Sequence, residues 1–183
     1  MTLEVHDIAS APEAARPVLE SVQKKYGFLP NLYRVFAAVP AALESYLAVS
    51  DQFARTSLTD AEKNVVLLAA SRENGCNYCV AVHSTVAGMQ GVPDHVVRST
   101  RDDKPIDDAR LEGLRTLTRA IVVKRGWLDP EDVKAFVAAG FREEQILEVL
   151  VGVTLKTLSN YTNHVAQTPL DDAFKAQAWS SGA

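Results

Sequence analysis

The sequence predicts an all-α protein, built as a bundle of antiparallel helix pairs. Apolar residues recur at spacings of three and four residues along nearly the whole chain, which is the period of an amphipathic helix. Capping residues, prolines and glycines stand where these segments would begin and end. The apolar runs "VLLAA" and "IVV" lie inside such capped segments, so they do not indicate strands. The connections are short, which favours antiparallel neighbours.

The first half of the chain predicts helices separated by glycine and proline. They are expected over about 11–25, from 31 to just before Pro40, from Pro40 onward, from 60 to 73, and over about 77–89. Thr59 and Glu62 match the T-x-x-E capping box, which fixes the start of the fourth of these helices. Gly75 suits the end of that helix, because glycine adopts positive φ readily.

The second half predicts helices of more varied length. They are a short helix at Pro93, an amphipathic helix ending at Gly126, a helix between Asp129-Pro130 and Gly140, a long one within 143–167, and a last short helix opened by Pro169. The long helix is mostly apolar and is expected to be buried. Its segment 146–158 is expected to bury surface between subunits, which predicts a homo-oligomer with closed symmetry.

Length and charge fit one soluble domain. The chain has 183 residues, of which 47% are hydrophobic, and a net charge of -4. We expect a single domain over 1–183, with residues 1–39 as an N-terminal helical arm and the core over about 40–175. No basic run indicates nucleic acid, and no apolar stretch indicates a signal peptide or a membrane span. We therefore expect a cytoplasmic protein, in which a C-x-x-C pair is more often catalytic or metal-binding than a structural disulfide.

The chemistry is expected in the segment "NGCNYCVAVH", which holds the only two cysteines of the chain. Cys76, Cys79 and His83 are spaced i, i+3, i+7, so they share one face of a helix that begins at Cys76. A helix N-terminus favours the thiolate, and such positions lower a cysteine pKa from about 8.5 to about 3.5–7.5. His83 lies one turn beyond Cys79, where it could hydrogen-bond the thiol and act as acid or base. A sulfenic acid formed on one cysteine would condense with the other to give a disulfide.

Other interpretations of these residues remain open. The two cysteines could be small core residues, or zinc ligands with His83, although a structural zinc site needs a fourth ligand that only His164 could supply through the fold. His83 could be a satisfied helix histidine. The remaining candidates have simpler structural explanations: His6, His95, His164, the capping residue Glu62, and Glu73 as an exposed carboxylate at a helix end.

The motif and its surroundings resemble a known family. The stretch "LTDAEKNVVLLAASRENGCNYCVAVHSTVA" resembles the core of the AhpD-like branch of the carboxymuconolactone decarboxylase family, and the flanks resemble its peroxidase-related members, over about residues 20–175. The resemblance implies an all-α fold that assembles into dimers, trimers or hexamers. It also implies reduction of hydroperoxides through the cysteine pair, with electrons from a lipoyl-bearing protein. Carried over, Cys79 would be the peroxidatic cysteine and Cys76 the resolving one.

The chain departs from that family pattern at two positions. Asn64 stands where the pattern has a glutamate of a proton relay, and Tyr78 stands where it has a histidine. An amide carries no proton as a carboxylate does, and a tyrosine with a pKa of about 10 is a poor base at neutral pH. Proton transfer would then fall to His83, to water or to Glu62.

The sequence thus predicts a thiol-dependent peroxidase with Cys76, Cys79 and His83 as its catalytic residues. The expected reaction converts a hydroperoxide and a dithiol into an alcohol, water and a disulfide. This reaction requires a dithiol reductant protein, and it requires no cofactor and no metal. The alternatives are a redox-sensing or zinc-sensing protein without enzymatic activity, and a cofactorless lactone decarboxylase.

Overall fold

The computed structural model describes residues 3–181, and every regular element in this range is helical. The prediction of an all-α fold is therefore confirmed. The α-helices are α1 (Arg16–Tyr26), α2 (Asn31–Phe36), α3 (Pro40–Ala54), α4 (Asp60–Glu73), α5 (Asn77–Met89), α6 (Asp94–Arg101), α7 (Ala109–Val123), α8 (Pro130–Ala138) and α9 (Gln145–Ala166). Two 3₁₀ segments, η1 (Glu13–Ala15) and η2 (Asp172–Gln177), lie near the two ends.

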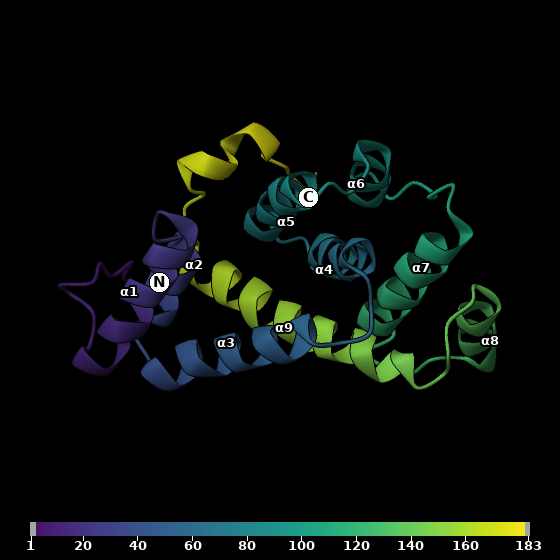
Figure 1. Cartoon of the computed structure of the whole chain (residues 1–183), viewed down its shortest axis with the longest axis horizontal. Coiled ribbons are helices and arrows are strands. Elements are labelled where there is room, and N and C mark those ends of the chain that lie inside the picture. Colours follow the sequence, from purple (N-terminus) through teal and green to yellow (C-terminus); the bar gives the residue numbers. More distant parts are fainter. Residues whose placement is uncertain (1–2, 182–183) are drawn as a thin grey trace.

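Two long helices and one central helix organise the bundle. The long helix α9 runs along the longest dimension of the molecule, with α3 packed beside it (Figure 1). Helix α4 contacts α5, α6, α7 and α9, so it lies at the centre of the packing. The apolar faces of these helices form one continuous core. Helix α5, which carries Cys79 and has Cys76 as its N-cap, packs against both α4 and α9.

The turn between α4 and α5 positions the first cysteine. Helix α4 begins with the predicted capping box: the backbone N–H of Glu62 donates to Thr59 Oγ1 (3.3 Å), and the N–H of Thr59 donates to Glu62 Oε2 (2.7 Å). It ends at Glu73, with Asn74 as its C-cap, and the next residue, Gly75, has a φ of 67°. Only a residue without Cβ adopts this conformation at low cost, so the chain reverses here and Cys76 becomes the N-cap of α5.

The predicted terminal helices differ in detail from the structure. The first is divided into the 3₁₀ turn η1 and helix α1, and it ends at Gly27 as expected. The last begins three residues after Pro169 and is a 3₁₀ segment. The backbone of Asp171 is extended, and its carboxylate accepts hydrogen bonds from the Asn31 N–H (3.1 Å) and from the Tyr78 hydroxyl (2.6 Å). These bonds hold the segment away from a helical conformation until Asp172.

Helix α9 is buried on one face within the chain, and its other face is exposed. Its inner face packs so closely that a Cβ on Gly152 would come within 2.7 Å of Phe53 and Val66. Its outer face leaves Leu147, Tyr161 and Val165 between 56% and 65% exposed. No helix in the described range is long and apolar enough to cross a membrane.

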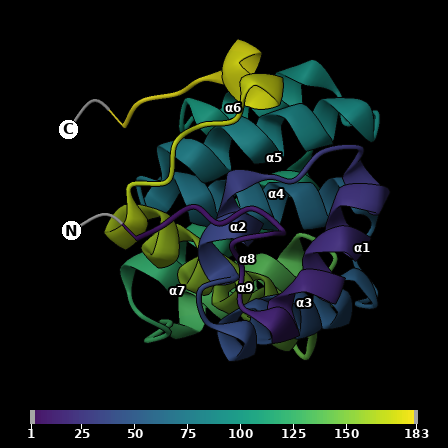
Figure 2. The same ribbon diagram turned by 90° about the vertical axis from the view of Figure 1, so that its left-hand side faces the viewer.

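The C-terminal segment folds back over the start of α5. Segment η2 packs against α5 (Figure 2), and Phe174 is buried against the ring of Tyr78. Arg101 of α6 donates to the backbone carbonyl of Gln177 (3.1 Å) and to its side chain (2.8 Å). Further along, a Cβ on Gly75 would meet Ser181 at 3.9 Å. The chain end therefore covers the turn that precedes Cys76.

Candidate active site

Both cysteines lie inside the bundle at the start of α5. Cys76 is the N-cap and Cys79 lies in the first turn, and each is 1% exposed. Both are free thiols. The two thiols affect each other's pKa through a hydrogen bond, so their side chains are neighbours.

A polar stripe on α9 faces the two sulfurs. Lys156, Ser159 and Asn163 follow each other at spacings of three and four residues, so they share one face of α9, and all three are buried. Asn163 Nδ2 lies 3.2 Å from Cys79 Sγ and 3.8 Å from Cys76 Sγ. Ser159 Oγ lies 3.9 Å from Cys79 Sγ. The cysteine pair is thus enclosed by hydrogen-bonding groups that belong to a different helix.

His83 has a different partner from the one that its spacing suggests. Its Nε2 accepts a hydrogen bond from Lys156 Nζ at 2.7 Å, and the described residues include no hydrogen bond between His83 and Cys79. Burial and the nearby ammonium of Lys156 hold the pKa of His83 well below its ordinary value. The imidazole is therefore neutral at neutral pH. Its Nδ1 is buried without a partner among residues 3–181.

The surroundings of the two thiols shift their pKa values in opposite directions. Burial by itself raises the pKa of Cys79. The hydrogen bond from Cys76, the charge and hydrogen bond of Lys156, and Ser159 outweigh burial and lower this pKa to about 5. The pKa of Cys76 is raised, first by the same hydrogen bond to Cys79 and then by burial. At neutral pH the site therefore holds one thiolate, Cys79, and one thiol, Cys76.

The two positions that depart from the family pattern have structural partners. Asn64 Nδ2 donates to the Asp60 carbonyl (2.8 Å) and to Gln90 Oε1 (2.6 Å), where Gln90 ends α5. Tyr78 donates to the Asp171 carboxylate and accepts from the N–H of Leu32 (3.3 Å). Burial and then the bond to Asp171 raise the pKa of the Tyr78 hydroxyl. Neither side chain is free to carry a proton at the thiols.

The other acidic and histidine candidates lie outside the site. Glu62 completes the capping box and pairs with Arg110 Nε at 2.6 Å, as its interpretation as a capping residue implies. The expectation of an exposed Glu73 is wrong, because its side chain is 10% exposed and pairs with Arg72 at 2.7 Å. His164 is exposed. Within the described residues no cluster of three or more His, Cys, Asp or Glu side chains could hold a metal ion.

Sequence reasoning missed the contribution of α9. The sequence predicts the long helix only as mostly apolar and buried, and it assigns no role to Lys156, Ser159 or Asn163. A signal was present, because a lysine and an asparagine interrupt the run "LVGVTLKTLSNYTNH". Their spacing of i, i+3, i+7 is also the spacing of Cys76, Cys79 and His83. Two helices with matching polar stripes are expected to pack those stripes together, since each buried polar group needs a partner.

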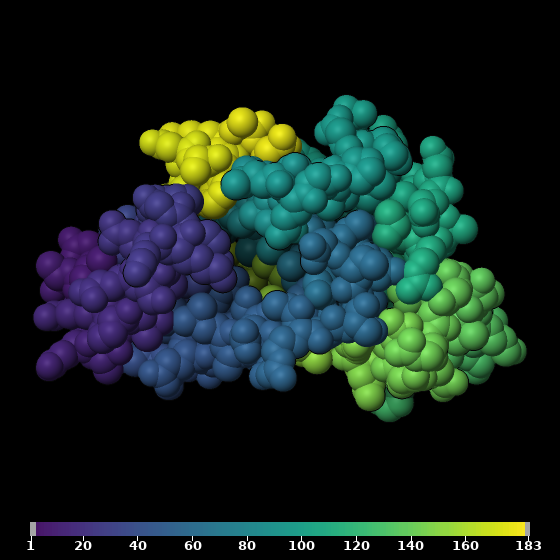
Figure 3. Space-filling model, viewed as in Figure 1, coloured from purple at the N-terminus to yellow at the C-terminus, as the bar shows by residue number. Residues whose placement is uncertain are grey.

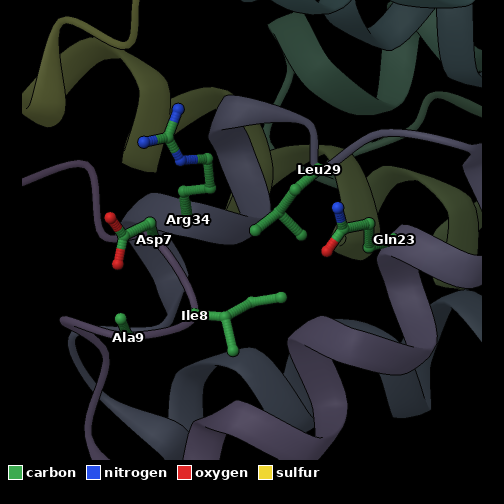
Figure 4. Close-up of a pocket in the computed structure, with 6 residues that line it drawn as sticks. All are labelled: Asp7, Ile8, Ala9, Gln23, Leu29 and Arg34. Carbon is green, nitrogen blue, oxygen red and sulfur yellow. The ribbon is translucent and has the colours of Figure 1, made fainter.

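Two cavities of the protein lie away from the thiols. One, of about 350 Å³, lies between the N-terminal segment, α1 and α2 (Figure 4). Another, of about 470 Å³, lies between α7 and α8. Neither is lined by a cysteine. The face in Figure 3 has a hollow where α2, α3 and α5 approach each other, with atoms of α9 at its bottom. Since both sulfurs are almost fully covered, a substrate reaches them only when the covering side chains or segments move.

Both cysteines lie in a part of the chain that matches a known protein family. Residues 37–102 match the carboxymuconolactone decarboxylase family, and this stretch contains both cysteines, His83 and Asn64. No curated protein sequence matches the chain.

Solved structures share the fold over nearly the whole chain. A peroxidase-related protein with an alkylhydroperoxidase AhpD core, from Ralstonia eutropha JMP134, is 22% identical, covers 93% of this chain and 92% of its own, and has a TM-score of 0.83. A peroxidase-related protein from Silicibacter sp. TM1040 is 16% identical over 95% of this chain and 92% of its own, with a TM-score of 0.80. The debrominase Bmp8 is 18% identical over 90% of both chains, with a TM-score of 0.76.

Proposed function

We propose that this chain is an AhpD-like member of the carboxymuconolactone decarboxylase family and a thiol-dependent peroxidase that reduces hydroperoxides through Cys79 and Cys76. The observation that carries the proposal is the pairing of a buried thiolate with a neighbouring thiol on the first turn of α5. A thiolate is the nucleophile that attacks a peroxide oxygen, and the second thiol converts the product into a disulfide.

The reaction proceeds in two steps. The Cys79 thiolate attacks the terminal oxygen of ROOH, so an S–O bond forms, the O–O bond breaks and the alkoxide leaves as ROH after it takes up a proton. The sulfenic acid on Cys79 then reacts with Cys76, so the S–S bond forms and water leaves. One hydroperoxide is reduced and two thiols are oxidised. A dithiol protein in the cytoplasm restores the pair, and the family resemblance suggests a lipoyl-bearing one.

The low pKa of Cys79 supports this assignment of roles. A thiol with a pKa of about 5 is almost wholly ionised at pH 7, whereas one at the ordinary value of 9.0 is about 1% ionised. Cys76, whose pKa is raised, stays protonated and reacts in the second step. The Asn163 amide donates to both sulfurs and lies closer to Cys79 Sγ, at 3.2 Å, than to Cys76 Sγ, at 3.8 Å. The closer contact is with the sulfur assigned as the thiolate.

The experiment is oxidation of the reduced protein by one equivalent of hydroperoxide, followed by mass spectrometry of the peptide that carries both cysteines. We expect a loss of two hydrogens in that peptide, and repeated peroxide consumption when a dithiol is supplied. Cys79→Ala should abolish both, and Cys76→Ala should stop at the sulfenic acid. Absence of any reaction between the wild-type thiols and peroxide would refute the proposal.

The same experiment separates the alternatives. A redox sensor would form the disulfide but would not turn over with dithiol. The debrominase with the same fold gives a second candidate, because a variant of it with one cysteine replaced by alanine was solved in complex with 2,3,4-tribromopyrrole. Supplying a bromopyrrole in place of the peroxide tests it, with release of bromide as the readout.

A further inference from the structure

Lys156 is the most deeply buried cationic side chain in the part of the chain that the structure describes. It is 1% exposed and lies in the middle of α9. Burying an ammonium group is costly unless an anion and hydrogen bonds compensate for the loss of water. Lys156 makes no salt bridge with a carboxylate among residues 3–181. Its compensating partners are the Cys79 thiolate and His83 Nε2.

The proposed reaction needs an acid at the place where Lys156 lies. When the O–O bond breaks, the departing alkoxide is a strong base that must be protonated. The titratable groups that interact with Lys156 are Cys76, Cys79 and His83. Tyr46 of α3 interacts with Cys79. His83 is neutral, and its Nε2 accepts a hydrogen bond instead of donating one. Burial raises the pKa of Tyr46, so its hydroxyl is a weak acid.

We propose that Lys156 is the general acid of this active site and donates the proton that the departing alkoxide takes up. The inference rests on the proposed peroxidase function and extends it. Lys156 Nζ lies 2.7 Å from His83 on α5, and Ser159, three residues further along the same face of α9, lies 3.9 Å from the Cys79 sulfur. This face of α9 therefore places the ammonium close to the sulfur at which the S–O bond forms. As the O–O bond breaks, one proton moves from Nζ to the alkoxide oxygen, so ROH leaves and Lys156 becomes a neutral amine. His83, at 2.7 Å from Nζ, orients the amine.

The second step uses the same group in reverse. The neutral amine takes the proton of the Cys76 thiol, the sulfur attacks the Cys79 sulfenic acid, and the proton passes to the hydroxide that leaves as water. The start of the cycle has one thiolate and one ammonium, and its end has a disulfide and a neutral amine. The site is therefore uncharged overall at both ends, and no lone ammonium is left buried after oxidation. Because the charge of Lys156 is compensated at the start of the cycle and absent at its end, the site never holds an unpaired buried ammonium, whose desolvation would be unfavourable.

The test compares two oxidants that differ in their need for an acid. Tert-butyl hydroperoxide releases an alkoxide, whereas peracetic acid releases a carboxylate, whose conjugate acid has a pKa of about 4–5 and which needs no proton at pH 7. Single-turnover oxidation of the wild type, Lys156→Met and Lys156→Gln is followed by mass, with peracetic acid freed of hydrogen peroxide by catalase. Rates are divided by the thiolate fraction of Cys79, measured by alkylation. Lys134→Met, at a highly exposed lysine, is the control.

General acid catalysis contributes about 10²–10⁴-fold. We expect the Lys156 variants to lose about 10²-fold or more with tert-butyl hydroperoxide, and less than tenfold with peracetic acid, while Lys134→Met behaves as wild type. Equal losses with both oxidants would overturn the role of Lys156 as an acid and leave it as a partner of the thiolate. A wild type that reacts with neither oxidant would instead refute the peroxidase function itself. Should Lys156→Met fail to fold, Lys156→Gln, which retains a hydrogen-bonding side chain, gives the same comparison.

Discussion

The hydrogen bond from Cys76 accounts for a measurable part of the acidity of Cys79, and Cys76→Ala removes it. A hydrogen bond to a charged acceptor contributes about 1.5–3 kcal/mol. At about 1.36 kcal/mol per pKa unit, its loss raises the pKa of Cys79 by about 1–2 units. The pKa should therefore move from about 5 to about 6–7. It should remain below the ordinary value, because Lys156 and Ser159 still act on the sulfur.

Alkylation by iodoacetamide against pH measures this shift. The folded pKa is lowered, so the thiolate is present above about pH 5 and the rate falls as the pH drops through that value. Each curve is normalised to its own plateau, since burial slows the reaction at every pH without moving the midpoint. Alkylation in denaturant gives the ordinary thiol midpoint as a reference. A wild-type midpoint near 9, or identical midpoints for wild type and Cys76→Ala, would refute the reasoning.

Three further predictions follow from particular contacts. His83→Ala should move the alkylation midpoint of Cys79 by less than one pKa unit, measured in the same assay, because a neutral imidazole bonded to Lys156 supplies no charge to the sulfur. Gly152→Ala should lower the free energy of unfolding by about 1–3 kcal/mol in urea titrations, since its Cβ would overlap Phe53, whereas Gly88→Ala, with open space, should be neutral or stabilising. Light scattering at micromolar concentration should show a homo-oligomer, because the outer face of α9 is apolar and exposed; a monomer would contradict this.

Local signals predicted the architecture because they act within a few residues. The capping box at Thr59, the reversal at Gly75 and the start of α3 at Pro40 each follow from the conformational limits of those residues. The 3₁₀ segment near the C-terminus was predicted less well. Its start depends on Asp171, whose carboxylate bonds Asn31 and Tyr78, and partners this distant in sequence leave no local pattern.

The candidate active site was predicted in part for the same reason. Cys76 and Cys79 could be found because their spacing and their place at a helix start are local properties. The hydrogen-bond partner of His83 could not be predicted, because the sequence alone is compatible with either of two partners. Spacing along α5 suggests Cys79, whereas packing against α9 selects Lys156. Only the relative placement of α5 and α9, which pack against each other and both against α4, decides between them.

Asn64 and Tyr78, which replace relay residues of the family that the chain resembles, each have a structural role in this protein. Asn64 is held by Gln90 at the far end of α5, and Tyr78 is held by Asp171 in the C-terminal segment. Both therefore stabilise the packing around α5 instead of serving the thiols. The proposed reaction still requires a proton carrier, and Lys156 is the candidate on the opposite helix. A carboxylate in that position would repel the thiolate and raise its pKa, whereas an ammonium lowers the pKa of Cys79 and can donate a proton. In the proposed mechanism one residue therefore meets both demands of the first chemical step.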